Sequence, residues 1–84
     1  EKGVPPIISA SYLRRWELVN IFLDAGADPF LEVKGSSLKE SIEYYINSSE
    51  GTPAFRKEIR ALMKRLQKQG MEFDFSTAKI KMED

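Results

Sequence analysis

Apolar residues recur at the spacing of an α-helix in three stretches of the chain. One stripe consists of Leu18, Phe22 and Ala25, at i, i+4 and i+7, with Val19 and Leu23 beside them. A second stripe consists of Leu38, Ile42, Tyr45 and Ile46. A third consists of Phe55, Ile59, Leu62 and Leu66, with Met63 adjacent. Because each stripe marks one apolar helical face, we expect three amphipathic helices that pack on one another.

The residues at the ends of these stripes are those that begin and end helices. Gly26 supplies the left-handed conformation that ends the first helix, and Gly70 does so for the last. Ser37 stands three positions before Glu40, which is the pattern of a capping box. Thr52 followed by Pro53 predicts the start of the last helix. Residues 7–11 are small or apolar and predict a further, short helix.

The segments between and after these helices have weaker signals. Residues 30–35 predict a turn or a β-like finger, and residues 47–51 have the composition of a loop. Residues 71–75 alternate apolar and polar side chains, which fits either a short strand or an extended exit segment. Residues 76–84 are mostly polar, and we expect a loose tail there.

Composition excludes several classes of chemistry. The 84 residues include neither cysteine nor histidine, so the thiolate and imidazole ligands of zinc and the usual proton-transfer side chain are absent. No paired carboxylates in an apolar setting, glycine-rich phosphate loop or hydrolase serine motif occurs either. We therefore expect a protein that is not an enzyme and needs no cofactor. The lack of an apolar run long enough for a membrane span, and of cysteine, leads us to expect a cytoplasmic or nuclear location.

The first half of the chain resembles the ankyrin repeat. That family's pattern ends its second helix in Gly-Ala-Asp, which matches residues 26–28. In the same gapless frame, the family's proline, first leucine, first alanine, valine pair and leucine pair fall on Pro6, Ile7, Ala10, Leu18-Val19 and Phe22-Leu23. The family's histidine and the Gly-His of the turn between the helices are replaced by Ile8 and Arg14-Arg15.

The second half resembles the repeat only in outline. Leu38 and Leu62 occupy the places of the two helices' first apolar residues, but they lie 24 positions apart. The ordinary repeat has about 11 positions there. Both helices of this unit must therefore be longer, with the loop at residues 47–51 between them. A charge-rich, atypical last unit is what shields the end of a repeat array from water.

The resemblance implies an all-α, ankyrin-like helix-turn-helix solenoid fragment with short β-like fingers. Residues 1–84 would form a single domain, with a first repeat at residues 5–35, a degenerate capping repeat at 36–75 and the tail at 76–84. The implied function is a non-catalytic, scaffold-like module for protein–protein interaction, whose partner the sequence does not identify. Because roughly three repeats are needed for stability, we expect further ankyrin repeats upstream or another chain over the face that carries Ile7.

The resemblance also indicates which residues contact the partner. Tyr12 and Leu13 occupy the variable positions that face the concave groove in ankyrin-like domains, although Leu13 could instead pack on a neighbouring repeat. Trp16 is either an interface hot spot or a packing residue. Val33, Lys34 and Ser36 lie on the finger, which either binds the partner or is a solvated turn.

The last helix supports an alternative function. Residues 56–68 carry six basic groups and one acidic group, a net charge of +5, in a chain whose formal net charge is zero. Arg56, Arg60 and Lys64 share one helical face and are the residues that we expect to contact nucleic acid or anionic lipid, and Lys57, Lys64 and Lys68 share a neighbouring face. The other interpretation is a solvated outer face of a terminal helix. A phosphate-binding helix would lose affinity steeply with added salt, whereas a protein-binding groove would lose much less.

Overall fold

The computed structural model describes residues 3–80, which contain four helices and one two-stranded sheet. Helix α1 (Pro6–Tyr12) and helix α2 (Trp16–Asp24) form a first helix-turn-helix unit. Strands β1 (Glu32–Val33) and β2 (Ser36–Ser37) form a short antiparallel hairpin. Helix α3 (Leu38–Ser48) and helix α4 (Pro53–Lys68) form the second helix-turn-helix unit. The chain is therefore mostly helical, with one small sheet, as an all-α class predicts.

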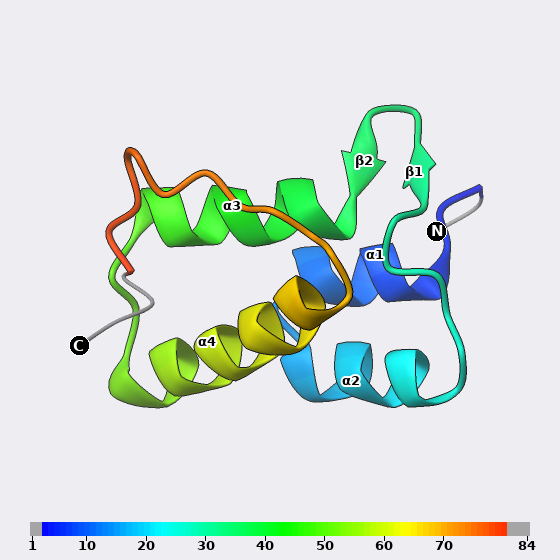
Figure 1. Cartoon of the computed structure of the whole chain (residues 1–84), viewed down its shortest axis with the longest axis horizontal. Coiled ribbons are helices and arrows are strands. Elements are labelled where there is room, and N and C mark those ends of the chain that lie inside the picture. The colour runs from blue at the N-terminus through cyan, green and yellow to red at the C-terminus, as the bar shows by residue number, and fades with distance from the viewer. Residues whose placement is uncertain (1–2, 81–84) are drawn as a thin grey trace.

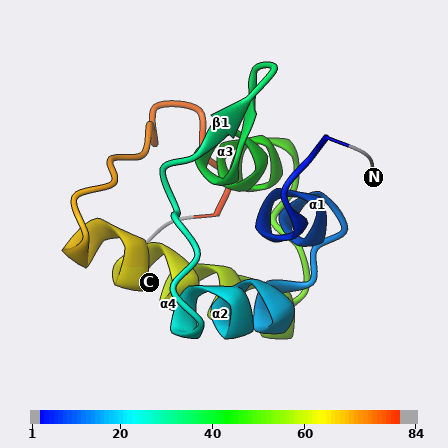
Figure 2. The same ribbon diagram turned by 90° about the vertical axis from the view of Figure 1, so that its right-hand side faces the viewer.

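The two units pack side by side, helix against matching helix. Helix α1 lies against α3, and α2 lies against α4. The hairpin projects from the junction of the two units, directly before α3 (Figure 1). Seen from the end, α1 and α3 form one layer and α2 and α4 the other (Figure 2).

The predicted start and stop signals are confirmed at three helices. The Ser37 hydroxyl accepts a hydrogen bond from the Glu40 amide at 3.1 Å, which caps α3. The Thr52 hydroxyl accepts one from the Phe55 amide, also at 3.1 Å, which caps α4. Gly26 has a φ of 96°, and the amide that follows it donates to the carbonyl of Phe22, closing the end of α2.

The predicted finger is a short β-hairpin with a two-residue turn. Glu32 pairs with Ser37 and Val33 with Ser36, which leaves Lys34 and Gly35 as the turn. Both turn residues have positive φ, 53° and 79°, as a type I′ turn requires.

The core lies between the two units and, on α2, is shifted to the Val19 and Leu23 side of the expected apolar face. The predicted stripes of α3 and α4 are buried except for the half-buried Tyr45 and Phe55, with Ile42, Ile46, Ile59 and Leu66 fully inaccessible. On α2, however, the buried residues are Trp16, Val19 and Leu23, whereas Leu18 and Phe22 are only half-buried. Helix α4 packs on α2, and Leu18 and Phe22 pack only partly against the core.

The tail is not loose over its described part. Ile80 is 1% exposed and belongs to the core, and Ala78 packs against that core. The amides of Lys79 and Ile80 both donate to the carbonyl of Ile46, near the end of α3. The prediction of a loose tail is therefore wrong for residues 76–80, and residues 81–84 lie outside the described part. The segment at residues 71–75 is an extended exit without strand pairing among the described residues.

Candidate partner-binding surface

The two residues predicted to face a partner groove lie on the surface at the end of α1. Tyr12 is the last residue of α1 and is 40% exposed, and Leu13 follows it at 66% exposure. Leu13 does not pack in the core of the described chain, so the structure presents an aliphatic side chain to solvent there. Exposed apolar and aromatic side chains that adjoin each other are typical of protein-binding sites.

The second unit brings two further tyrosines to the same place. The Tyr45 hydroxyl donates a hydrogen bond to the backbone carbonyl of Tyr12. The ring of Tyr44 meets that of Tyr45 edge-on, with centroids 5.1 Å apart, and Tyr44 is 62% exposed. We call Tyr12, Leu13, Tyr44 and Tyr45 the tyrosine surface. Sequence reasoning did not select Tyr44 for this role, although its position between Ile42 and Tyr45 puts it outside the apolar stripe and therefore toward solvent.

A groove adjoins the tyrosine surface because the second unit is longer than the first. Helix α3 has 11 residues against 7 in α1, and α4 has 16 against 9 in α2. The second unit therefore extends beyond the turn between α1 and α2 (Figure 1). The resulting step groove has a volume of about 550 Å³ and is lined by Leu13, Arg14, Tyr45, Ser49, Gly51, Thr52 and Phe55.

Arg14 is the only charged residue that lines the step groove, and its backbone is strained. Its φ is 60°, in the left-handed region that favours glycine. The amides of Arg14 and Arg15 donate to the carbonyls of Ser11 and Ala10, which is the hydrogen-bond pattern of a Schellman motif. Helices α2 and α4 end in the same pattern with Gly26 and Gly70 at the left-handed position.

The backbone and the side chain of Arg14 contribute opposite energetic terms. A non-glycine residue in the left-handed region costs of the order of 1 kcal/mol or more. The Arg14 guanidinium lies 5.8 Å from the centroid of the Tyr45 ring, and an exposed cation–π contact of this kind is worth about 0.5–1 kcal/mol. That contact offsets half or more of a cost near ~1 kcal/mol.

Trp16 lies beneath the groove rather than on the surface. It is 2% exposed, and its ring packs against those of Tyr45 and Phe55, with centroids 5.8 and 6.0 Å away. A partner cannot reach this ring in the folded chain, so the structure assigns Trp16 to packing, one of the two roles left open by the sequence. It supports the two rings that line the groove.

The finger is separate from the tyrosine surface. Lys34 is exposed at the turn, while Val33 and Ser36 are half-buried and Val33 packs against the core. The hairpin joins the first residue of α3, whereas Tyr44 and Tyr45 lie in its last turns. At 1.5 Å per residue, Ser37 and Tyr45 are about 12 Å apart along the helix. The finger residues and the tyrosines therefore do not form one continuous site.

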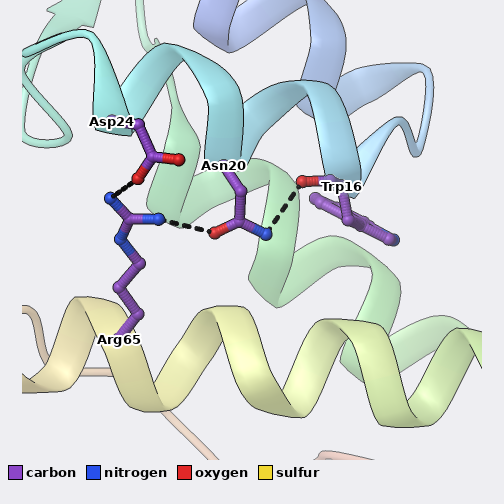
Figure 3. A network of polar contacts seen from close by, with 4 residues as sticks. All are labelled: Trp16, Asn20, Asp24 and Arg65. Atoms are coloured by element: carbon purple, nitrogen blue, oxygen red, sulfur yellow. Dashed lines mark hydrogen bonds and ion pairs between the residues drawn. The ribbon is translucent and has the colours of Figure 1, made fainter.

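Two of the basic residues on α4, Arg56 and Arg65, make hydrogen bonds that stabilise the fold. Arg65 donates to the carboxylate of Asp24 at 2.7 Å and to the amide oxygen of Asn20 at 3.1 Å, which joins α4 to α2 (Figure 3). Asn20 in turn donates to the carbonyl of Trp16. Arg56 donates to the carbonyls of Glu50 and Gly51 and thereby holds the loop before α4.

The fully exposed basic row of α4 is the neighbouring face of lysines, not the row selected for a phosphate contact. Of the three residues proposed for a phosphate contact, Arg56 and Arg60 are half-buried and only Lys64 is exposed. Lys57, Lys64 and Lys68 are all exposed and lie at i, i+7 and i+11, on one side of the helix. We call these three residues the lysine row.

Acidic residues gather between the hairpin, α3 and the exit segment, around a groove of about 470 Å³. Two carboxylates in this region accept hydrogen bonds from backbone amides. Glu43, which lines the groove, accepts from the Asp74 amide at 2.8 Å, and Asp74 on the exit segment accepts from the Ser76 amide at 2.9 Å. The hydrogen bonds from Ser76 lower the pKa of Asp74, with a smaller contribution from Lys39. Among residues 3–80, no group of three or more acidic side chains is arranged to hold a metal ion.

Within the described residues, none of the helices is both long and apolar enough to cross a membrane. Comparison of the chain with models of known protein families, with curated proteins and with solved structures found no match.

Proposed function

We propose that this chain is a non-catalytic module of the ankyrin-like type that binds a protein partner through the tyrosine surface. The observation that carries the proposal is the meeting of Tyr12 and Leu13 from the first unit with Tyr44 and Tyr45 from the second. Tyrosine supplies a large contact area at low cost in conformational entropy, and it is enriched where protein interfaces are energetically strong. The Tyr45–Tyr12 hydrogen bond fixes the two units relative to each other at this point, so the surface is preorganised.

The architecture supports the ankyrin-like part of the proposal. Two helix-turn-helix units lie side by side with a hairpin between them, first helix against first helix and second against second. Stacking of equivalent helices is how a repeat array builds one continuous core. The second unit differs from the first in its longer helices and in the tail that covers part of the core at Ile46. Such additions suit a unit that closes the end of an array.

A second apolar groove supports the presence of further units. It lies on the first unit, has a volume of about 400 Å³ and is lined by Val4, Pro6, Ser9, Ala10, Leu13, Arg15, Leu18 and Phe22. Leu18 and Phe22 are only half-buried on α2. We propose that a preceding helix-turn-helix unit packs on them and leaves the Leu13 end of the groove to the partner. Thermal unfolding of the isolated chain, followed by circular dichroism at several concentrations, tests this part. A low melting temperature supports it, and a sharp, concentration-independent transition at about 45–65 °C, the usual range of mesophile domains, contradicts it.

Affinity capture with paired variants tests the binding function. The double variant Leu13→Ser, Tyr44→Ser removes the two most exposed side chains of the tyrosine surface without touching the core. The matched control is Ile21→Ser, which removes a side chain that is 53% exposed on α2. We expect proteins captured by the unmodified chain and by the control to be lost with the double variant. Retention of all of them by the double variant would refute the proposal.

The lysine row supports a second candidate function, contact with nucleic acid or anionic lipid. Three lysines on one side of a helix form a small basic patch, and binding through it would weaken steeply as salt rises. Titration with phosphatidylserine vesicles and with a single-stranded oligonucleotide, at low and moderate salt, tests it. The double variant Lys57→Ala, Lys64→Ala should remove such binding. Binding to the tyrosine surface should survive both the salt and the substitutions.

A further inference from the structure

We infer that the step groove takes a partner segment in which an aromatic or large apolar side chain stands beside a carboxylate. This inference rests on the proposed function, because the groove shares Leu13 and Tyr45 with the tyrosine surface. It adds to that function the chemistry of the partner.

The apolar half of the inference follows from the walls of the groove. Leu13 is 66% exposed on one side, and the rings of Tyr45 and Phe55 meet at a centroid distance of 6.2 Å on the other. Trp16 packs behind both rings, so neither ring can swing away without opening the core. A flat or branched apolar side chain placed between Leu13 and these rings would lose contact with water on both faces. The volume of about 550 Å³ is enough for one large side chain and its neighbour.

The acidic half follows from Arg14. It is the only charge among the residues that line the groove, and the other polar lining consists of Ser49, Gly51 and Thr52. Glu50 lies on the same loop but is not part of the lining. Guanidinium is suited to paired hydrogen bonds with a carboxylate. Arg14 is exposed, so its guanidinium can pair with a partner's carboxylate while it stays in contact with the Tyr45 ring.

Small probes separate the two halves of the inference. The probes are N-acetylphenylalanine, which carries a ring beside a carboxylate, its uncharged amide, and acetate, which has the carboxylate alone. Each is titrated into the isotope-labelled 84-residue chain, and backbone amide shifts are followed by NMR. We expect N-acetylphenylalanine to shift the amides of Arg14, Gly51 and Thr52. It should bind up to about fivefold more tightly than its amide, the range of one exposed ion pair, and acetate should bind most weakly.

Two arginine variants provide the decisive comparison. Arg14→Gly removes the guanidinium from a position where glycine fits the backbone, so the fold is retained. We expect this variant to bind the acid and the amide equally. Arg15→Gln removes a neighbouring exposed arginine that does not line the step groove, and it should keep the preference for the acid. The inference would be overturned if Arg14→Gly preferred the acid over the amide as strongly as the unmodified chain does. Backbone amide shifts confined to other parts of the surface would also overturn it.

The failure of this inference can be told apart from the failure of the proposed function. If Arg14→Gly retains every captured protein while Leu13→Ser, Tyr44→Ser loses them, the acidic preference is refuted and the binding function stands. If the double variant Leu13→Ser, Tyr44→Ser retains every captured protein, the binding function itself is refuted, whatever the result with the small probes.

Discussion

The hydroxyl of Tyr45 donates a hydrogen bond to the backbone carbonyl of Tyr12, which lies 33 positions earlier in the chain. The bond joins the last turns of α3 to the end of α1, and the Tyr45 ring also packs against Trp16 and Phe55. One side chain therefore contributes both to the core and to the candidate binding surface. The contact between the two units at this point depends on it.

Tyr45→Phe isolates the contribution of that hydrogen bond. The ring contacts remain and only the hydroxyl is lost, so we expect the free energy of unfolding to fall by about 0.5–1.5 kcal/mol. Urea denaturation measures this as a lower midpoint with an unchanged slope. The control is Tyr44→Phe, at an exposed position, for which we expect a change within about 0.5 kcal/mol. Equal effects of the two substitutions would show that the Tyr45–Tyr12 bond contributes nothing.

Arg14→Gly should be more stable than Arg14→Gln. Both variants lose the contact with the Tyr45 ring, but only glycine relieves the left-handed strain at a φ of 60°. Glycine also gains freedom in the unfolded state, which offsets part of that relief. We therefore expect the free energy of unfolding of Arg14→Gly, measured in urea, to exceed that of Arg14→Gln by about 1 kcal/mol. Equal stability of the two variants would show that the backbone at Arg14 carries no strain.

The sequence predicted the local features of this fold better than its long-range contacts. Helix starts at Ser37 and Thr52, and the end of α2 at Gly26, follow from side-chain and backbone chemistry within one turn, and all were correct. Which apolar residues of α2 are most buried did not follow from the sequence, because Leu18, Val19, Phe22 and Leu23 are all apolar. Periodicity cannot say which pair faces a helix that lies some 40 residues later in the chain. The Tyr45–Tyr12 contact, which creates the tyrosine surface, likewise joins residues that are distant in the sequence, so no local pattern predicts it.

The burial of two further residues depends on contacts with distant segments. Ile80 is a lone apolar residue in a polar tail, so no periodic signal marks it, and its burial depends on space left between distant helices. Trp16 precedes the predicted stripe of α2, and its burial depends on Tyr45 and Phe55 from the other unit. The step groove arises from the difference in helix length between the units. That difference was predicted, but the packing that makes a groove of it was not.

Ile80→Ser should destabilise the fold, although it lies in a segment that looks like a tail. Exposing or deleting a buried isoleucine side chain costs about 2 kcal/mol or more. The Ile80 amide, which donates to the Ile46 carbonyl, should also lose its protection from hydrogen exchange. Lys79→Ser, at an exposed neighbour, should change stability by less than about 0.5 kcal/mol. If Ile80→Ser is as mild as this control, the tail does not contribute to the core.

Arg65 and Lys64 are adjacent basic residues on α4 that should behave differently. Arg65→Ala removes two hydrogen bonds to α2 and the packing of a half-buried stem, so we expect a loss of about 1 kcal/mol in the free energy of unfolding. Asp24→Asn should cost less than about 0.5 kcal/mol, because the Asp24 side chain is 69% exposed and solvent screens the pair. Asn20→Ala should cost more than Asp24→Asn, since Asn20 also donates to the Trp16 carbonyl.

Lys64→Ala is the control for this set, since Lys64 is exposed on the lysine row. It should leave stability unchanged and alter only the binding of anionic vesicles or oligonucleotides, if the chain binds them. Urea denaturation and vesicle titration on the same variants separate the two roles. Loss of stability in Lys64→Ala, or an unchanged stability in Arg65→Ala, would contradict the division of the α4 charges into a row that faces solvent and an arginine that holds the helices together.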